Sequence, residues 1–247
     1  LTAAIPSMAG PSHHQAPRRT TITALVVKSW GNCTSTSLIW DDLNAHWSNY
    51  GTIQISIDYN YPGLCLTNDT VTLAKLEASG ANVVILSDSA GQHALFSSAE
   101  AQALNQYANE GHNVIGTYLT IEYDGTDNRV LAPSFGVSST STYDVSGAAI
   151  TPTYTERFPS LPLFRNLGNP YVSSGYNFSE LPGDGAWSSN ELTTAKLVAR
   201  TSDSQAAILL RRAHAFYGIY IANMPEYLGG TLDEQFFYNA IIYPATG

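Results

Sequence analysis

Charged side chains are scarce in this chain of 247 residues. Asp, Glu, Lys and Arg make up 13% of it, and there are only three lysines, Lys28, Lys75 and Lys196. This share is about half that of an average soluble protein. Eleven basic residues against 20 acidic ones leave a net charge of −9. This balance excludes the basic surface that nucleic-acid binding requires, and it disfavours binding to an anionic membrane.

Long apolar runs and metal-binding cysteine motifs are also missing. The longest apolar runs, such as the one over residues 81–86, are far too short to cross a bilayer. Only two cysteines occur, Cys33 and Cys65, without a C-x-x-C motif, and no three potential ligands have the spacing of a metal site. No glycine-rich phosphate loop is present. We therefore expect no membrane span, no catalytic metal and no cofactor.

The polar residues that are present are mostly uncharged, which suits an extracellular protein. Three N-x-[ST] sequons, at Asn32, Asn68 and Asn177, lie in polar, turn-like sequence and favour a secreted glycoprotein. The sequence begins without Met and has no apolar signal segment within residues 1–24, as expected of a mature chain after signal removal. A cytosolic protein with chance sequons is the alternative.

Strand and helix patterns alternate through the first half of the sequence. Ser97 or Ser98, followed by Glu100, is typical of a capped helix start. The resulting β-α-β order predicts a three-layer, flavodoxin-like α/β fold with a mostly parallel sheet and helices on both faces. The hydrophobic spacing predicts strands over 23–28, 53–57, 83–87 and 114–119, and helices over 39–47, 71–79 and 98–111.

The second half of the sequence is less regular. Residues 122–194 are rich in Pro and Gly, and we interpret them as a long irregular insertion. A late antiparallel hairpin follows, and then a further strand and a closing helix. We expect a single α/β domain over 23–247, preceded by an extended N-terminal arm over 1–22. The hairpin is predicted over 195–200 and 206–210, the strand over 216–222 and the helix over 233–242.

A disulfide between Cys33 and Cys65 follows from this arrangement. Each cysteine lies in the loop after one of the first two strands, and these strands are usually neighbours in a doubly wound sheet. Their loops leave from the same edge of the sheet, so the bridge is within reach. Two buried free thiols in a cytosolic protein are the alternative.

Candidate functional residues lie where the expected parallel strands end, because open parallel sheets bind ligands at that edge. Paired carboxylates there can act as acid and base if burial or proximity splits their pKa values. The alternative is that the carboxylates cap loops and helices, and that the histidine lies on a surface loop. The catalytic candidates are Asp88, Glu122, Glu226 and His93, and the ligand-binding candidates are Trp30, Asp58, Tyr118 and Asn223.

Three segments carry a resemblance to a known family. They are the strand–helix–strand stretch Asn82–Thr120, the L-x-P-x-x-G segment within Arg129–Val137, and Tyr217–Tyr227 with the helix that contains Asn239. Together they resemble the class I glutamine amidotransferase-like superfamily, nearest to its trehalose-utilisation (ThuA-like) branch. The resemblance implies the flavodoxin-like fold.

The catalytic residues of that family are not matched here. The family places a nucleophilic Cys on the elbow after the fourth strand, where this sequence has Thr117 or Tyr118. It also has a His-Pro-Glu triplet after the late strand, where this sequence reads Met224-Pro225-Glu226. Without the thiolate and the imidazole, acyl transfer has neither nucleophile nor base. The resemblance therefore implies the scaffold and argues against glutaminase activity.

Two functions remain open at this point. The first is a non-catalytic extracellular protein that binds glycans or assembles with copies of itself through the arm over 1–22. The alternative is a secreted carbohydrate-directed hydrolase that uses the carboxylates named above. The first is favoured because no group of residues in the sequence demands chemistry.

Overall fold

The computed structural model places the helices and strands along most of the chain. The described residues are 21–29, 39–88, 95–118, 120–121, 129–138, 143–146, 153–156, 161–173, 179–182, 193–200, 206–222, 224–227 and 229–246.

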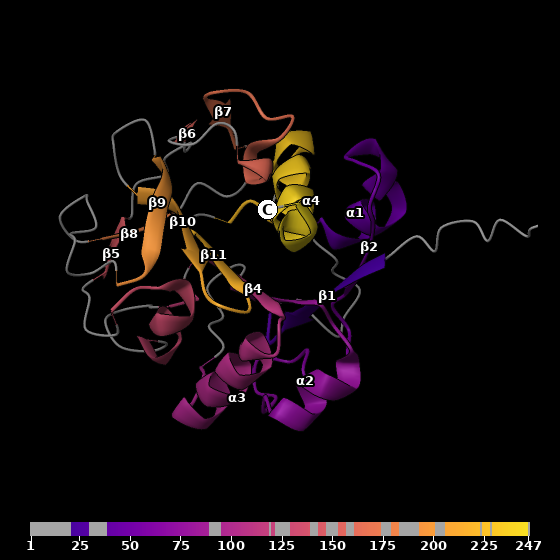
Figure 1. Cartoon of the computed structure of the whole chain (residues 1–247), viewed down its shortest axis with the longest axis vertical. Coiled ribbons are helices and arrows are strands. Elements are labelled where there is room, and N and C mark those ends of the chain that lie inside the picture. The colour runs from indigo at the N-terminus through magenta and orange to yellow at the C-terminus, as the bar shows by residue number, and fades with distance from the viewer. Residues whose placement is uncertain are drawn as a thin grey trace, which may run out of the picture.

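The centre of the fold is a twisted sheet whose first five strands are parallel (Figure 1). Their spatial order is β2-β1-β3-β4-β11, as in flavodoxin-like proteins. The register pairs Val26 with Ile85 and Ile115 with Ile219. The fold class predicted from the sequence is thereby confirmed. The bounds are β1 Thr21–Val27, β2 Gln54–Asp58, β3 Val83–Asp88, β4 Asn113–Tyr118 and β11 Tyr217–Ile221.

The sheet continues past β11 with antiparallel strands. The late hairpin predicted from the sequence is present as β9 and β10, and β10 pairs with β11. Beyond β9 the sheet is extended by β6 and then by β7, while β5 and β8 form a separate pair. The bounds are β9 Ala195–Arg200, β10 Ala206–Arg212, β6 Thr153–Glu156, β7 Tyr171–Val172, β5 Tyr143–Ser146 and β8 Ser179–Pro182.

Helices cover both faces of the parallel strands (Figure 1). One apolar core joins the sheet to α1 and α4, and the other joins it to α2 and α3. Alternate strand residues supply the two cores: Ala24 and Val26 face α4, whereas Leu25 and Val27 face α3. The helices are α1 Trp40–His46, α2 Leu73–Ser79, α3 Ser98–Asn109 and α4 Thr231–Thr246, with shorter 3₁₀ turns η1 Trp47–Asn49, η3 Arg129–Phe135 and η4 Pro162–Phe164.

The ends of α3 and α4 show how local sequence sets these elements. Ser97 caps α3, and Glu100 completes a capping box, as the sequence predicts. In α4, Phe236, Phe237, Ala240 and Ile241 are fully buried, also as predicted. The helix runs over Thr231–Thr246 and is longer than the expected 233–242 at both ends, and buried Tyr243 continues its apolar pattern.

Two details differ from the sequence-based expectation. Residues 21 and 22, expected in the N-terminal arm, belong to β1, because Thr21 and Ile22 pair with Gln54 and Ile55 of β2. Part of the expected irregular insertion over 122–194 is regular, since β6 pairs with β9 and lengthens the sheet. The rest of the arm, residues 1–20, lies outside the described residues.

The 3₁₀ turn η3 lies directly on the sheet over β4 and β11. Two glycines allow this close approach. A Cβ at Gly116 would meet the Phe135 ring at 2.4 Å, and a Cβ at Gly218 would meet the Ser134 carbonyl oxygen at 2.4 Å. η3 thus lies against β4, close to where this strand reaches the candidate site.

Within the described part of the chain, none of the helices combines the length and apolar character that a bilayer crossing requires.

Candidate functional site

Four neighbouring parallel strands end at one edge of the sheet. These are β1, β3, β4 and β11, and the strand order reverses between β1 and β3. In open α/β sheets this edge is where ligands bind. The register brings Ser87 beside Thr117 and Asp88 beside Tyr118 at this edge. The residues just beyond the strand ends therefore form the candidate site.

Tyr118 ends β4 in an unusual backbone conformation. Its φ is +50°, in the left-handed region that bulky residues rarely adopt. The surrounding turn is held by Thr120, whose Oγ1 donates to the Leu86 carbonyl oxygen at 2.7 Å and accepts from the Thr117 N–H at 3.3 Å. The Tyr220 hydroxyl donates to the Tyr118 carbonyl oxygen at 2.7 Å. A sharp, well-supported elbow therefore follows β4.

Glu226 is completely buried beside this elbow. Its Oε1 accepts hydrogen bonds from the Ser87 hydroxyl at 2.6 Å and from the Thr117 hydroxyl at 2.5 Å. The three residues come from β3, from β4 and from the segment after β11. One carboxylate oxygen thus ties together the ends of these elements.

The elbow side chain packs against the same late segment. Tyr118 forms a small apolar cluster with Met224, and Tyr227 packs against both. Met224 is fully buried and Tyr118 nearly so. Glu226 thus accepts from two hydroxyls, while a phenol and a thioether pack together at the neighbouring elbow.

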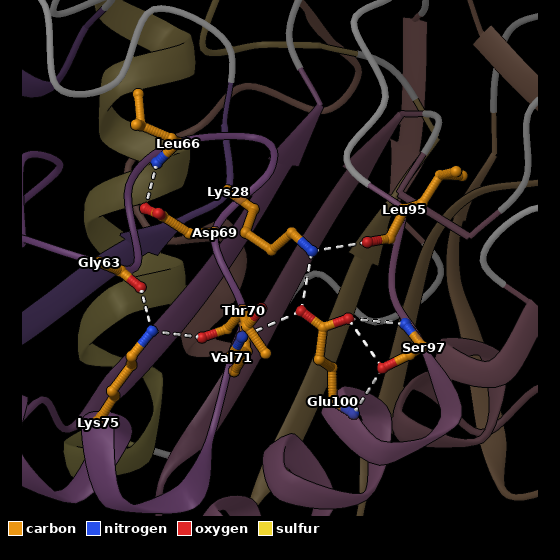
Figure 2. A network of polar contacts seen from close by, with 10 residues as sticks. All are labelled: Lys28, Gly63, Leu66, Asp69, Thr70, Val71, Lys75, Leu95, Ser97 and Glu100. Atoms are coloured by element: carbon orange, nitrogen blue, oxygen red, sulfur yellow. Dashed lines mark hydrogen bonds and ion pairs between the residues drawn. The ribbon is translucent and has the colours of Figure 1, made fainter.

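A buried ion pair holds the other side of the edge, after β1 (Figure 2). Lys28, with φ of +49°, donates from its Nζ to the Leu95 carbonyl oxygen at 2.6 Å and to Glu100 Oε1 at 2.9 Å. The same Nζ lies 4.6 Å from the centre of the Phe96 ring. Lys28 thus connects the end of β1 to the start of α3.

Glu100 accepts further hydrogen bonds from the Val71 N–H at 3.0 Å, the Ser97 N–H at 2.8 Å and the Ser97 hydroxyl at 2.9 Å. Burial alone would raise the pKa of Glu100, but the hydrogen bonds from Ser97, Val71 and Lys28 outweigh it and lower the pKa from 4.5 to about 2. Each Glu100 oxygen is held by two donors. This carboxylate is therefore a structural clamp rather than an acid or base.

The candidate carboxylates Asp58 and Glu226 differ in their surroundings, since Glu226 is buried at the elbow. Asp58 lies exposed at the end of the edge strand β2, and its Oδ1 accepts from the Asn60 N–H at 2.9 Å, which is the loop-capping role. Asp88 is the last residue of β3, and only its backbone is described. Tyr118 and Glu226 do meet at the elbow, through Thr117. The candidates Trp30, His93, Glu122 and Asn223 lie outside the described residues.

Sequence reasoning does not assign Ser87 and Lys28 to the site. The available signal is a polar residue at the end of an apolar run, with Ser87 following Leu86 and Lys28 following Val27. Thr117 enters the sequence argument only as a replacement for a nucleophile. Its hydrogen bond to Glu226 depends on tertiary structure.

A resident metal finds no support in the described part of the chain. No group of three or more His, Cys, Asp and Glu side chains there is arranged to hold an ion. The expectation of no metal concerns the whole chain and stays a prediction.

The expected disulfide and glycosylation positions are described in part. Cys65 is fully buried and disulfide-bonded. Cys33, the only other cysteine in the sequence, lies outside the described residues. β1 and β2, whose following loops carry the two cysteines, are parallel neighbours as expected. Asn68 is exposed, while Asn32 and Asn177 lie outside the described residues.

Comparison with known proteins supports the fold. No protein-family model matches the chain, and no curated protein matches it. Among solved structures, a putative ThuA-like protein from Bacteroides uniformis matches with a TM-score of 0.55 at 14% identity, covering 98% of this chain and 95% of that one. A cytoplasmic protein from Salmonella typhimurium matches with a TM-score of 0.55 at 11% identity, covering 90% and 98%.

A putative GMP synthase protein from Thermoplasma acidophilum is also similar, with a TM-score of 0.51 at 13% identity, covering 91% of this chain and 94% of that one. At such low identities the similarity concerns the fold alone. The chain therefore has a glutamine amidotransferase-like, flavodoxin-like fold.

Proposed function

We propose that this chain is a secreted glycoprotein that binds glycans and performs no amidotransferase chemistry. The observation that carries the proposal is the occupancy of the elbow after β4. Tyr118 holds the strained position there, and its ring packs against Met224 and Tyr227. Acyl transfer by this type of scaffold needs a thiolate and an imidazole, and Tyr118 and Met224 supply neither.

The hydrogen bonds of Glu226 support the same interpretation. In a nucleophile–base–acid arrangement, the carboxylate orients the base. Here its Oε1 accepts from the hydroxyls of Ser87 and Thr117 instead. The carboxylate therefore stabilises the ends of β3 and β4.

An extracellular location is part of the proposal. Cys65 is disulfide-bonded, which is typical of oxidising compartments. Asn68 lies in a sequon and is exposed, so an oligosaccharide can be attached there without unfolding the chain. We propose Cys33 as the disulfide partner and expect N-linked glycan on at least one of Asn32, Asn68 and Asn177.

Three measurements test these points: a glutaminase assay, an intact mass and a non-reduced digest. The purified protein should release no ammonia from glutamine, and alkylation of its thiols should change nothing. Glutaminase activity that disappears in Cys33→Ser or Cys65→Ser would overturn the proposal. For the location, intact mass of native material should exceed that of the 26.6 kDa polypeptide. A non-reduced digest that yields two unmodified thiol peptides would contradict the disulfide.

A carbohydrate-directed hydrolase is the second candidate, and one observation favours it. Asp88 ends β3 directly beside Tyr118, one position beyond the Ser87 that binds Glu226. Two carboxyls near one cleft can cleave a glycosidic bond. Assays on neutral oligosaccharides with the native chain and Asp88→Asn separate the two functions. If the native chain hydrolyses an oligosaccharide and Asp88→Asn does not, hydrolysis takes the place of glycan binding as the proposed function.

Self-association through the rest of the expected arm, residues 1–20, is a further proposed property. Light scattering on the full chain and on a chain lacking residues 1–20 tests it. An oligomeric mass for the full chain and a monomeric mass for the truncated chain support the arm as the contact. The same oligomeric state for both chains contradicts it.

A further inference from the structure

A hollow lies between α1–η1 and the start of α4, away from the strand ends. Its volume is about 470 Å³, and its lining includes Asp42, Asn49, Tyr50, Asn166, Thr231 and Glu234. Tyr50 and Glu234 are buried and form its floor, whereas Asn49, Asn166 and Thr231 lie at its mouth. Figure 1 shows α1 and α4 on the same side of the sheet.

A chain of hydrogen-bonded groups crosses this hollow. The Tyr50 hydroxyl donates to Glu234 Oε2. Burial raises the pKa of Glu234, the hydrogen bond from Tyr50 lowers it and the neighbouring Asp42 carboxyl raises it, so that the pKa lies above its ordinary value. Asp42 Oδ1 in turn lies 2.8 Å from His46 Nδ1. Tyr50, Glu234 and Asp42 thus form one polar cluster at the hollow, in which Glu234 holds its proton more tightly than an ordinary glutamate.

The walls of the hollow are fixed before any ligand arrives. Gln235 donates from its Nε2 to the Tyr50 carbonyl oxygen at 3.2 Å and to Asn239 Oδ1 at 3.0 Å. Asn239 then donates from its Nδ2 to the carbonyl oxygens of Leu163 at 3.1 Å and Arg165 at 2.7 Å.

These bonds tie η1, α4 and the turn after η4 into one frame. Asn166, directly after Arg165, has a φ of +62° and lies at the mouth of the hollow. A preformed polar hollow loses little freedom on binding.

The lining chemistry selects one class of ligand. Among its described residues there is no lysine or arginine, so an anion finds no countercharge. Side-chain amides and a hydroxyl in the lining donate and accept hydrogen bonds and the carboxylates accept them, which matches the hydroxyl groups of a sugar. Leu232, 40% exposed, offers an apolar contact for the C–H face of a ring.

We propose that this hollow is a saccharide-binding site, with Asp42, Asn49 and Asn166 contacting the hydroxyls of a neutral sugar over the Tyr50–Glu234 floor. The site deepens the proposed glycan-binding function and rests on it. It is separate from the strand-end edge that holds Tyr118 and Glu226.

Calorimetric titration of the full chain with maltose, cellobiose and chitobiose tests the proposal. We expect one of these probes to bind, and Asp42→Ala or Asn166→Ala to weaken it about tenfold or more, the effect of losing a hydrogen bond in a site. Glu77→Gln, on the exposed side of α2, removes one acidic charge elsewhere and should bind unchanged.

Each contrary result has its own meaning. A sugar that binds the native chain and the Asp42 and Asn166 variants equally overturns this hollow and leaves glycan binding intact. A chain that binds none of the three probes contradicts both. Titration with calcium chloride covers the alternative of a cation: calcium binding that is lost in Asp42→Ala, without sugar binding, overturns the saccharide assignment. Circular dichroism checks that the Asp42→Ala, Asn166→Ala and Glu77→Gln variants are folded.

Discussion

Lys28 illustrates what single residues reveal only in the folded chain. Its side chain is buried and bound to Glu100, which lies far away in the sequence. A lysine after an apolar run is normally interpreted as a solvated strand end, and nothing in the sequence indicates its partner. Ser97 and Glu100 were predictable, because a capping box is a local pattern. Glu226 was predictable as a carboxylate at the edge where the strands end, but its hydrogen bonds to Ser87 and Thr117 were not.

The Lys28–Glu100 pair leads to a first prediction. Lys28→Met leaves a buried carboxylate without its countercharge and should lower the free energy of unfolding by about 3 kcal/mol. Glu100→Gln should also destabilise the protein, because it leaves the ammonium buried. The double variant should lose less than the sum of the two, with a coupling of about 1–3 kcal/mol. Urea denaturation of the four proteins measures this cycle. Additive losses would show that the pair contributes nothing beyond packing.

Helices and strands with strong local patterns were predictable, and short strands were not. The four early strands and three early helices follow hydrophobic periods that the sequence displays over several residues. β6 and β7 comprise 4 and 2 residues, and β6 is placed by its pairing with the distant β9. A strand this short has too few positions to show a period, so tertiary pairing decides it.

The start of α3 supplies a second prediction. The Ser97 hydroxyl accepts from the Glu100 N–H and donates to its carboxylate. Ser97→Ala should therefore cost about 1 kcal/mol of stability, whereas Ser98→Ala, at the exposed first position of the helix, should cost much less. Thermal unfolding of both variants gives the comparison. Equal losses would contradict the cap.

The contact of η3 with the sheet supplies a third prediction. An added Cβ at Gly218 would meet the backbone oxygen of Ser134, which cannot move aside as a side chain can. Gly218→Ala should thus cost about 2 kcal/mol or more through overpacking. Gly80→Ala is the control: nothing lies within 4 Å of its added Cβ, so only the left-handed backbone is strained, at about 1 kcal/mol. Chemical denaturation ranks the two, and an equal or reversed order contradicts the close approach.

For the molecule as a whole, stability should depend on pH through two carboxyls of opposite behaviour. The pKa of Glu100 is lowered from 4.5 to about 2, so its contribution is complete above the unfolded value and is lost as the pH falls toward 2. The shift corresponds to about 3 kcal/mol. The pKa of Glu234 is raised, mainly by burial, so the folded chain holds this proton more tightly and loses stability as the pH rises above 4.5.

Unfolding by urea at a series of pH values measures both effects. Glu100→Gln should flatten the acid side of the profile, and Glu234→Gln should remove the decline above pH 4.5 that Glu234 causes. Tyr50, Asp42 and His46 face Glu234 and remain in that variant, so a decline that persists unchanged would assign the effect to them.

The layered architecture of the whole molecule was predictable because it follows from the order of strong periods along the chain. The arrangement of the strand ends depends instead on β11 inserting beside β4. That pairing joins Ile115 to Ile219 across the entire Pro- and Gly-rich segment.

This late insertion of β11 and α4 has a consequence for synthesis. The strands β1 to β4 can pair as soon as they leave the ribosome, and α2 and α3 are then available to cover one face. The opposite face, which includes Val26, Ile85 and Ile115, is covered largely by Phe236, Phe237 and Ile241 of α4, and α4 follows every strand in the sequence. The part of this core that α4 covers, beside the part that α1 covers, therefore stays exposed in a nascent chain until α4 has been synthesised. During that interval the exposed apolar surface favours association with other unfinished chains.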